Sequence, residues 1–212
     1  MFKTLGLVFA LSIGLTTDAF ACLGETVLFE DTFKEKDGSW FISNEDASAN
    51  YVSIDNGRLK LRPPPEKGRA AMVAAVLHPA DVDICTKVII TAGGPTDMNF
   101  GIDFWASGGT DSYSYFVNGA GSFGLSRWNG KSWIGVLPVA STTALRAGIG
   151  EENTLRILAK DGMITMFIND IQVGKVRGQK PTVQTQAGVR VFRRTGAPVS
   201  VEYTRFKVTN TP

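Results

Sequence analysis

Histidine and cysteine are scarce in this chain, which has one histidine and two cysteines among 212 residues. Metal sites that need two or more histidine ligands are therefore excluded. A Ser-His-Asp triad would depend on His78, which precedes Pro79 near the expected end of a strand, and we expect a surface or hydrogen-bonded imidazole there instead. A large excess of charge is also missing, because the net charge is only +2. This balance does not favour nucleic acid as a partner.

Long apolar runs are absent after residue 21, so the sequence offers no segment of the roughly 20 apolar residues that a membrane-spanning helix needs. The first 21 residues have a different pattern. Lys3 precedes an apolar run from Leu5 to Leu15, and Ala19-Phe20-Ala21 has the small-x-small form of a cleavage site. We therefore predict that residues 1–21 are a removed signal peptide and that the protein is secreted or periplasmic.

Cleavage after Ala21 would make Cys22 the first residue of the mature chain, and three states of this cysteine are open. It could pair with Cys85, carry the lipid of a lipoprotein, or stay a free thiol like Cys85. A lipoprotein signal usually has leucine where this chain has Ala19. Because export brings oxidising conditions, we favour a disulfide between Cys22 and Cys85.

Sustained helical periodicity is missing as well, and short apolar or alternating runs recur instead, separated by residues that favour turns. Asp55-Asn56-Gly57, Asn129-Gly130, Asp161-Gly162 and Asn169-Asp170 are such turn sequences. We predict one domain over residues 22–212, an all-β, two-sheet antiparallel jelly-roll sandwich. The expected strands lie near Thr26–Phe33, Tyr51–Ile54, Arg58–Leu61, Ala71–Leu77, Val82–Thr91, Asn99–Ala106, Ser112–Val117, Ser122–Trp128, Ser132–Leu137, Thr154–Lys160, Met163–Asn169, Gln172–Arg177, Gly188–Phe192 and Val199–Val208.

Strand alternation assigns side chains to faces. In the run from Asn99 to Ala106 it predicts that Phe100, Ile102 and Phe104 lie in the core, and that Asp103 and Trp105 project from the opposite face.

The hairpin at Asn129-Gly130 predicts a second pair of outward aromatic residues. A two-residue turn pairs Ser126 with Trp133 and Leu125 with Ile134, which places Trp128 and Trp133 together on the outer face. The register of the preceding hairpin stays open. One connection turns Tyr113 and Tyr115 onto the Trp133 face, and a three-residue loop turns them away.

Aromatic rings beside short polar side chains suit a saccharide, because a pyranose offers an apolar C–H face for stacking and a rim of hydroxyl groups. Such rings are also often covered by a loop, and that alternative stays open. The candidate ligand-binding residues are Trp105, Trp128, Trp133, Asp103, Tyr113, Tyr115 and Arg127. Arg127 is the weakest of these, because alternation places it with the core set near a strand end.

Several strand-and-turn motifs together resemble the concanavalin A-like (laminin-G-like) superfamily, and more closely exported bacterial relatives of the 3-keto-disaccharide hydrolase domain family. The motifs are Phe29-Glu30-Asp31-Thr32-Phe33 followed by Trp40, Gly57-Arg58-Leu59-Lys60-Leu61, Phe100-Gly101-Ile102-Asp103-Phe104-Trp105, Tyr113-Ser114-Tyr115-Phe116-Val117, Asn153-Thr154-Leu155-Arg156-Ile157 and Phe167-Ile168-Asn169-Asp170. The resemblance implies a jelly roll with saccharide ligands, sometimes with calcium. Members often end in a Phe-Asp-Asn-Phe-like strand, whereas Tyr203-Thr204-Arg205-Phe206 lacks the acid here.

Paired carboxylates would be needed for glycoside hydrolysis. The Glu-x-Asp-x-x-Glu pattern of jelly-roll glucanases is absent from this sequence, so we predict no catalytic residue. For calcium only Glu30 and Asp31 are weak candidates, and no other cofactor is indicated.

We therefore expect an exported, non-catalytic, lectin-like protein with a carbohydrate partner. A glycosidase-like hydrolase and a structural or adhesion module are the alternatives. The sequence does not indicate an oligomeric state.

Overall fold

The computed structural model describes residues 22–212, which form two antiparallel β-sheets packed face to face. The predicted signal peptide lies outside the described residues. No helix among the described residues is long and apolar enough to cross a bilayer. The all-β, two-sheet jelly-roll prediction is confirmed.

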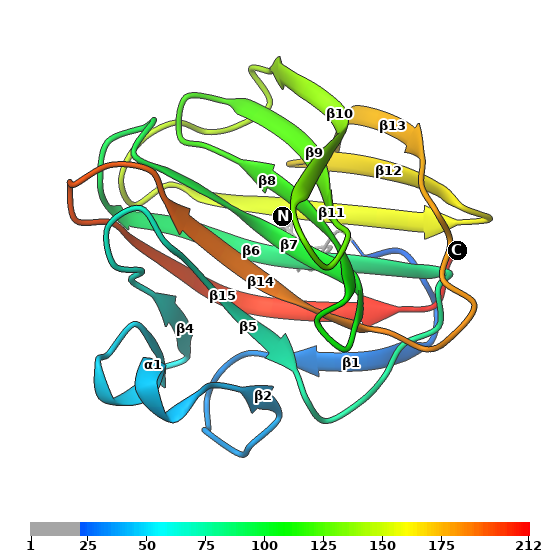
Figure 1. Cartoon of the computed structure of the whole chain (residues 1–212), viewed down its shortest axis with the longest axis horizontal. Helices are drawn as coiled ribbons and strands as arrows, with labels where there is room; N and C mark the ends of the chain where they lie inside the picture. The colour runs from blue at the N-terminus through cyan, green and yellow to red at the C-terminus, as the bar shows by residue number, and fades with distance from the viewer. Residues whose placement is uncertain (1–21) are drawn as a thin grey trace, which may run out of the picture.

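One sheet has eight strands and the other has seven, stacked as two layers in Figure 1. The eight-stranded sheet has the order β13 (Ile171–Arg177), β12 (Met163–Ile168), β11 (Glu152–Lys160), β6 (Val82–Ala92), β15 (Ser200–Thr209), β4 (Arg58–Leu61) and β3 (Val52–Asp55), and β1 (Val27–Asp31) also pairs with β15. The seven-stranded sheet has the order β10 (Trp133–Ser141), β9 (Ser122–Trp128), β8 (Asp111–Val117), β7 (Met98–Ser107), β14 (Gln186–Arg193), β5 (Gly68–Val73) and β2 (Trp40–Phe41). Of these strands, β2 was missed by the sequence pattern because two residues are too short to show alternation.

A short helix, α1 (Asn44–Ser48), lies with β2 at one end of the sandwich (Figure 1). Ser43 caps its N-terminus, because the Ser43 side chain accepts a hydrogen bond from the backbone N–H of Asp46, as is usual for a helix cap. This helix was not expected from the sequence, since one turn carries no periodic signal.

The core lies between the two sheets and follows the predicted alternation. Phe100, Ile102 and Phe104 of β7 are buried, as expected. Tyr203 of β15 reaches across from the other sheet, and its hydroxyl lies 3.0 Å from the carbonyl oxygen of Arg190 and 3.3 Å from that of Gly101. Burial raises the pKa of the Tyr203 phenol, which keeps it a neutral donor. It therefore fastens β14 and β7 to the opposite layer.

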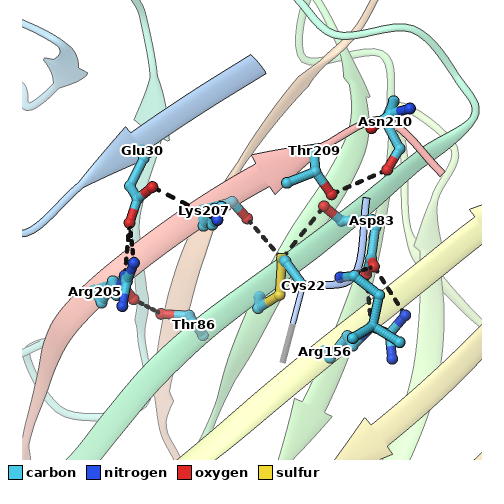
Figure 2. The surroundings of a disulfide bond; sticks show 11 residues. Cys22, Glu30, Asp83, Thr86, Arg156, Arg205, Lys207, Thr209 and Asn210 are labelled. Atoms are coloured by element: carbon cyan, nitrogen blue, oxygen red, sulfur yellow. Dashed lines mark hydrogen bonds and ion pairs between the residues drawn. A yellow bond between two sulfur atoms is a disulfide. The ribbon is translucent and has the colours of Figure 1, made fainter. Parts of the chain in front are cut away.

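The disulfide between Cys22 and Cys85 is confirmed, with 5.7 Å between the two Cα atoms. Beside it, the buried carboxylate of Asp83 accepts hydrogen bonds from Arg156 at 2.7 and 2.8 Å (Figure 2). The same carboxylate also accepts a hydrogen bond from the backbone N–H of Leu23, at 2.9 Å. The start of the described chain is thus held to β6 by a covalent bond and by the Leu23 hydrogen bond, and the buried ion pair joins β6 to β11 beside it. A lipid anchor would need the Cys22 sulfur that the disulfide occupies.

Loss of this disulfide is expected to destabilise the fold. The bond joins residues 63 positions apart, and a crosslink of that span lowers the entropy of the unfolded chain by an amount worth about 2 to 4 kcal/mol. A Cys22→Ala/Cys85→Ala variant should therefore lose about that much free energy of unfolding in urea titrations. The wild type under reducing conditions is the control and should lose a similar amount. Unchanged midpoints in both would contradict this role.

His78 differs from its prediction as a surface or hydrogen-bonded imidazole. Its side chain is 1% exposed, and neither ring nitrogen has a hydrogen-bond partner among residues 22–212. The ring packs edge-on against Phe29, with 6.5 Å between the ring centres. Burial lowers the pKa of His78 from 6.5 to about 4, so the folded protein holds the imidazole neutral.

This lowered pKa predicts acid sensitivity. Between pH 6.5 and pH 4 the unfolded chain binds a proton at His78 that the folded chain does not bind, so folding stability falls as the pH falls through this window. The loss approaches about 3 kcal/mol at the lower end. A His78→Leu variant has no imidazole to bind this proton. The free energy of unfolding of the wild type, relative to that of the variant, should therefore decrease from pH 7 to pH 4. The measurement is the free energy of unfolding of both proteins at each pH. A difference that stays constant with pH would contradict the prediction.

Candidate functional site

The outer face of the seven-stranded sheet carries two neighbouring depressions, with volumes of about 290 and 390 Å³. Trp133 and Arg190 line both of them, and we call the pair the outer-face groove. The first depression is mainly aromatic with short polar groups, and its other lining residues include Asn99, Ser114, Phe116, Ser126 and Phe192. The second is more polar, and its other lining residues include Met72, Asp103, Asp111, Trp128 and Gln186.

The indoles of Trp128 and Trp133 share this face as predicted, but through a different register. Trp133 pairs directly with Trp128, and Ser126 faces Gly135. The predicted pairing of Ser126 with Trp133 was wrong because the loop has four residues, not two. The side chain of Asn129 closes it by accepting hydrogen bonds from the backbone N–H groups of Lys131 and Ser132, at 3.0 and 2.9 Å.

The two indoles contact each other, with 5.6 Å between their centres and 52° between their planes. Trp133 is 43% exposed. Trp128 is partly buried and donates a hydrogen bond from its indole nitrogen to the carbonyl oxygen of Gly109 at 3.0 Å. Trp133 therefore presents the accessible ring, and Trp128 supports it.

Asp103 projects to this face as predicted, and its partner is Arg190, which the sequence analysis did not select. The Nε and Nη2 atoms of Arg190 both lie 2.7 Å from Oδ2 of Asp103. The guanidinium carbon also lies 5.1 Å from the ring centre of Trp133, a cation–π distance. Arg190 thus links the carboxylate to the exposed indole. Alternation in Gly188–Phe192, where Val189 and Val191 are buried, was the signal that could have placed Arg190 outward.

The second oxygen of Asp103 has an unusual environment. Asp103 is 1% exposed, yet its Oδ1 has no hydrogen-bond partner among residues 22–212. A buried acceptor without a donor costs about 1 to 3 kcal/mol. The groove therefore contains one unsatisfied acceptor beside its exposed indole.

Trp105 does not lie on this face, and its prediction as a stacking residue was wrong. Its backbone is left-handed, with φ at 51°, and the pairing of β7 with β8 shifts between Phe104 and Ser107. Alternation fails at such an irregularity. The indole is 2% exposed, and its nitrogen donates to the carbonyl oxygen of Ala80 at 2.8 Å. It packs in the core.

Tyr113 and Tyr115 also turn into the core, which resolves the open hairpin register and contradicts their candidate role. Val117 faces Phe123, so Phe116 faces Gly124 and lies on the outer face instead. The Tyr113 hydroxyl accepts from the backbone N–H of Gln179 at 2.8 Å. Burial raises the pKa of Tyr115. Neither ring can contact a ligand in the groove.

Arg127 belongs to a different surface. It follows the inward set of β9, as alternation indicated, and its Nε donates to Asp111 at 2.8 Å. This hydrogen bond raises the pKa of Arg127. Its guanidinium lies over the Tyr113 ring, in a separate depression of about 340 Å³ beside Gln179. The structure does not bring Arg127 together with Trp133.

The weak metal candidates Glu30 and Asp31 are occupied by protein groups. Glu30 forms ion pairs with Arg205 and Lys207 (Figure 2). Asp31 accepts hydrogen bonds from the backbone N–H of Phe33 at 2.6 Å and the indole N–H of Trp40 at 2.7 Å. Such neighbours compete with a cation, so the structure argues against calcium at these two residues.

No family model and no curated protein matches this sequence. Solved structures do match its fold. A protein of unknown function with a galectin-like fold from Bacillus subtilis has a TM-score of 0.66 at 11% identity, covering 89% of this chain and 98% of that one. A β-glucanase from Bacillus licheniformis has a TM-score of 0.65 at 10% identity, covering 86% and 97%. A carbohydrate-binding module from Bacillus subtilis has a TM-score of 0.56 at 12% identity, covering 89% and 99%. At these identities the likeness shows the fold alone, a two-sheet antiparallel jelly roll like that of the galectin-like and glucanase structures.

Proposed function

We propose that this chain is an exported, non-catalytic saccharide-binding protein whose ligand lies in the outer-face groove. The observation that carries the proposal is the exposed Trp133 indole, held between Trp128 and Arg190 within a depression lined by short polar side chains. A carbohydrate-related role is plausible for a fold that a glucanase and a carbohydrate-binding module share.

The chemistry of the groove supports a sugar. The exposed indole suits the apolar C–H face of a pyranose, because both surfaces are flat and apolar. Around it, Asn99, Ser114 and Ser126 offer amide and hydroxyl groups that can hydrogen-bond sugar hydroxyls. Because two depressions meet at Trp133, the groove can accept more than one sugar ring.

Export remains part of the proposal. It rests on the sequence of residues 1–21, and the disulfide between Cys22 and Cys85 supports it, since such bonds persist in oxidising compartments.

Removing the exposed indole should abolish most of the binding. A Trp133→Ala variant is expected to bind any glycan that the wild type recognises at least about tenfold more weakly, equal to ~1.4 kcal/mol, because the stacking surface is lost. The measurement is a glycan array followed by calorimetric titration of the strongest ligand found.

Ile171→Ala is the matched control, because Ile171 is also exposed, at 56%, and lies on the edge strand β13 of the other sheet. It should bind like the wild type. Binding that survives Trp133→Ala unchanged would exclude the groove, and a wild type that binds no glycan would exclude the function.

A glycoside hydrolase is the second candidate, because Asp103 and Asp111 both line the second depression and hydrolysis needs two carboxyl groups. The sequence resemblance to exported relatives of the 3-keto-disaccharide hydrolase domain family also favours this candidate. However, Arg190 binds Asp103 and Arg127 binds Asp111. Two carboxylates held by arginines suit fixed hydrogen-bond acceptors better than a proton donor, so we favour binding without catalysis.

Hydrolysis assays separate the two candidates. We expect no sugar release when the wild type is incubated with disaccharides and polysaccharides, including those that it binds. Products that form with the wild type and disappear with Asp103→Asn or Asp111→Asn would establish the hydrolase instead. Products that persist in both variants would indicate a contaminating enzyme.

A further inference from the structure

Charge in the outer-face groove is arranged unevenly around Asp103. Oδ2 of Asp103 has both contacts from Arg190, at 2.7 Å each, whereas Oδ1 has no partner among residues 22–212. The carboxylate is 1% exposed and lines the second depression. A buried, half-satisfied carboxylate therefore lies at the wall of the groove.

Arg190 is the only cationic side chain that lines either depression, among the described residues. It is already engaged, because the same guanidinium binds Asp103 and lies over the Trp133 ring. A negatively charged ligand would have to compete with Asp103 for this arginine. It would also approach a second carboxylate, Asp111, in the same depression. The groove consequently disfavours anions.

A ligand group that donates a hydrogen bond is favoured in the groove, in contrast to an anionic group. A ligand hydroxyl or N–H group that donates to Oδ1 satisfies an acceptor that the protein leaves unpaired, and this recovers the free energy that the buried, unpaired acceptor costs. Because Oδ1 is buried, a ligand reaches it only when a side chain of the groove shifts, and the partly exposed Arg190, at 31%, is the neighbour that we expect to shift. Arg190 can keep its contact with Oδ2 while the ligand takes Oδ1.

We propose that the groove selects saccharides that are neutral or carry amino groups and rejects acidic ones, with Asp103 Oδ1 as the acceptor that sets this specificity. This inference rests on the proposed saccharide-binding function. It adds the charge class of the ligand and names Asp103 Oδ1 as the atom that discriminates between the classes. Arg190 acts as a positioning residue, because it holds both the Asp103 carboxylate and the Trp133 ring.

The test compares matched glycans that differ only in charge. The probes are neutral oligosaccharides of glucose, galactose, mannose and N-acetylglucosamine, with partners in which one residue is a uronate or carries a sulfate. For each neutral glycan that the wild type binds, the acidic partner should bind at least about tenfold more weakly. Equal or tighter binding of the acidic partners would overturn the inference and leave the proposed function standing. Absence of binding to every probe would overturn both.

Two variants assign the effect to Asp103. Asp103→Asn keeps the size of the side chain but removes its charge, so the difference between neutral and acidic partners should fall to about threefold or less. Glu202→Gln is the matched control, because Glu202 also pairs with an arginine, Arg58, but lies on β15 of the other sheet. It should keep the full difference. Discrimination that persists in a folded Asp103→Asn protein would show that Asp103 does not set the specificity. The wild-type comparison tests the charge class even if that variant does not fold.

Discussion

The course of β7 is the constraint on which the site depends. From Phe100 to Phe104 the strand alternates, so that three apolar side chains enter the core while Asp103 faces outward. At Trp105 the backbone becomes left-handed, and the Trp105 side chain turns inward rather than onto the surface. The indole then donates to Ala80 and fills the end of the sandwich. Had alternation continued, Trp105 would have projected from the same face as Asp103. The irregularity therefore keeps the second depression open.

The strands that form the groove are held in place by a contact from the opposite sheet as well as by contacts within their own sheet. The Tyr203 hydroxyl reaches across the core to the backbone oxygens of Gly101 on β7 and Arg190 on β14. These two strands carry the Asp103–Arg190 pair. Because this phenol is buried and neutral, the contacts persist across ordinary pH. The pair itself joins β7 to β14, and Arg190 extends the connection to Trp133 on the edge strand. A charged residue that would usually be solvated thus orders an exposed aromatic ring, which lowers the entropy lost when a ligand stacks on it.

Local patterns predicted the sandwich, the core of β7 and the disulfide, because each depends on alternation, turn residues or redox compartment. They failed where one residue or one loop decides the outcome. A single positive φ at Trp105 leaves no trace in the apolar pattern, and the hydrogen bonds of Asn129 turned a two-residue turn into a four-residue loop. Arg190 was missed for another reason. It pairs with Asp103 across 87 positions of sequence, and only the sheet order reveals that β7 and β14 are neighbours.

The fold by itself does not decide between binding and catalysis, since similar sandwiches include a glucanase and a carbohydrate-binding module. The decision rests on the freedom of the carboxylates in the groove. A hydrolase must protonate its leaving group, so one carboxyl group has to hold a proton and reach the glycosidic oxygen. Here Asp103 is buried under a guanidinium that also holds an indole, and moving it toward a substrate would break both contacts. Accepting one hydrogen bond at Oδ1 needs only a side-chain shift in which Arg190 keeps its contact with Oδ2. The geometry is therefore better suited to recognising a hydroxyl group than to cleaving the bond beside it.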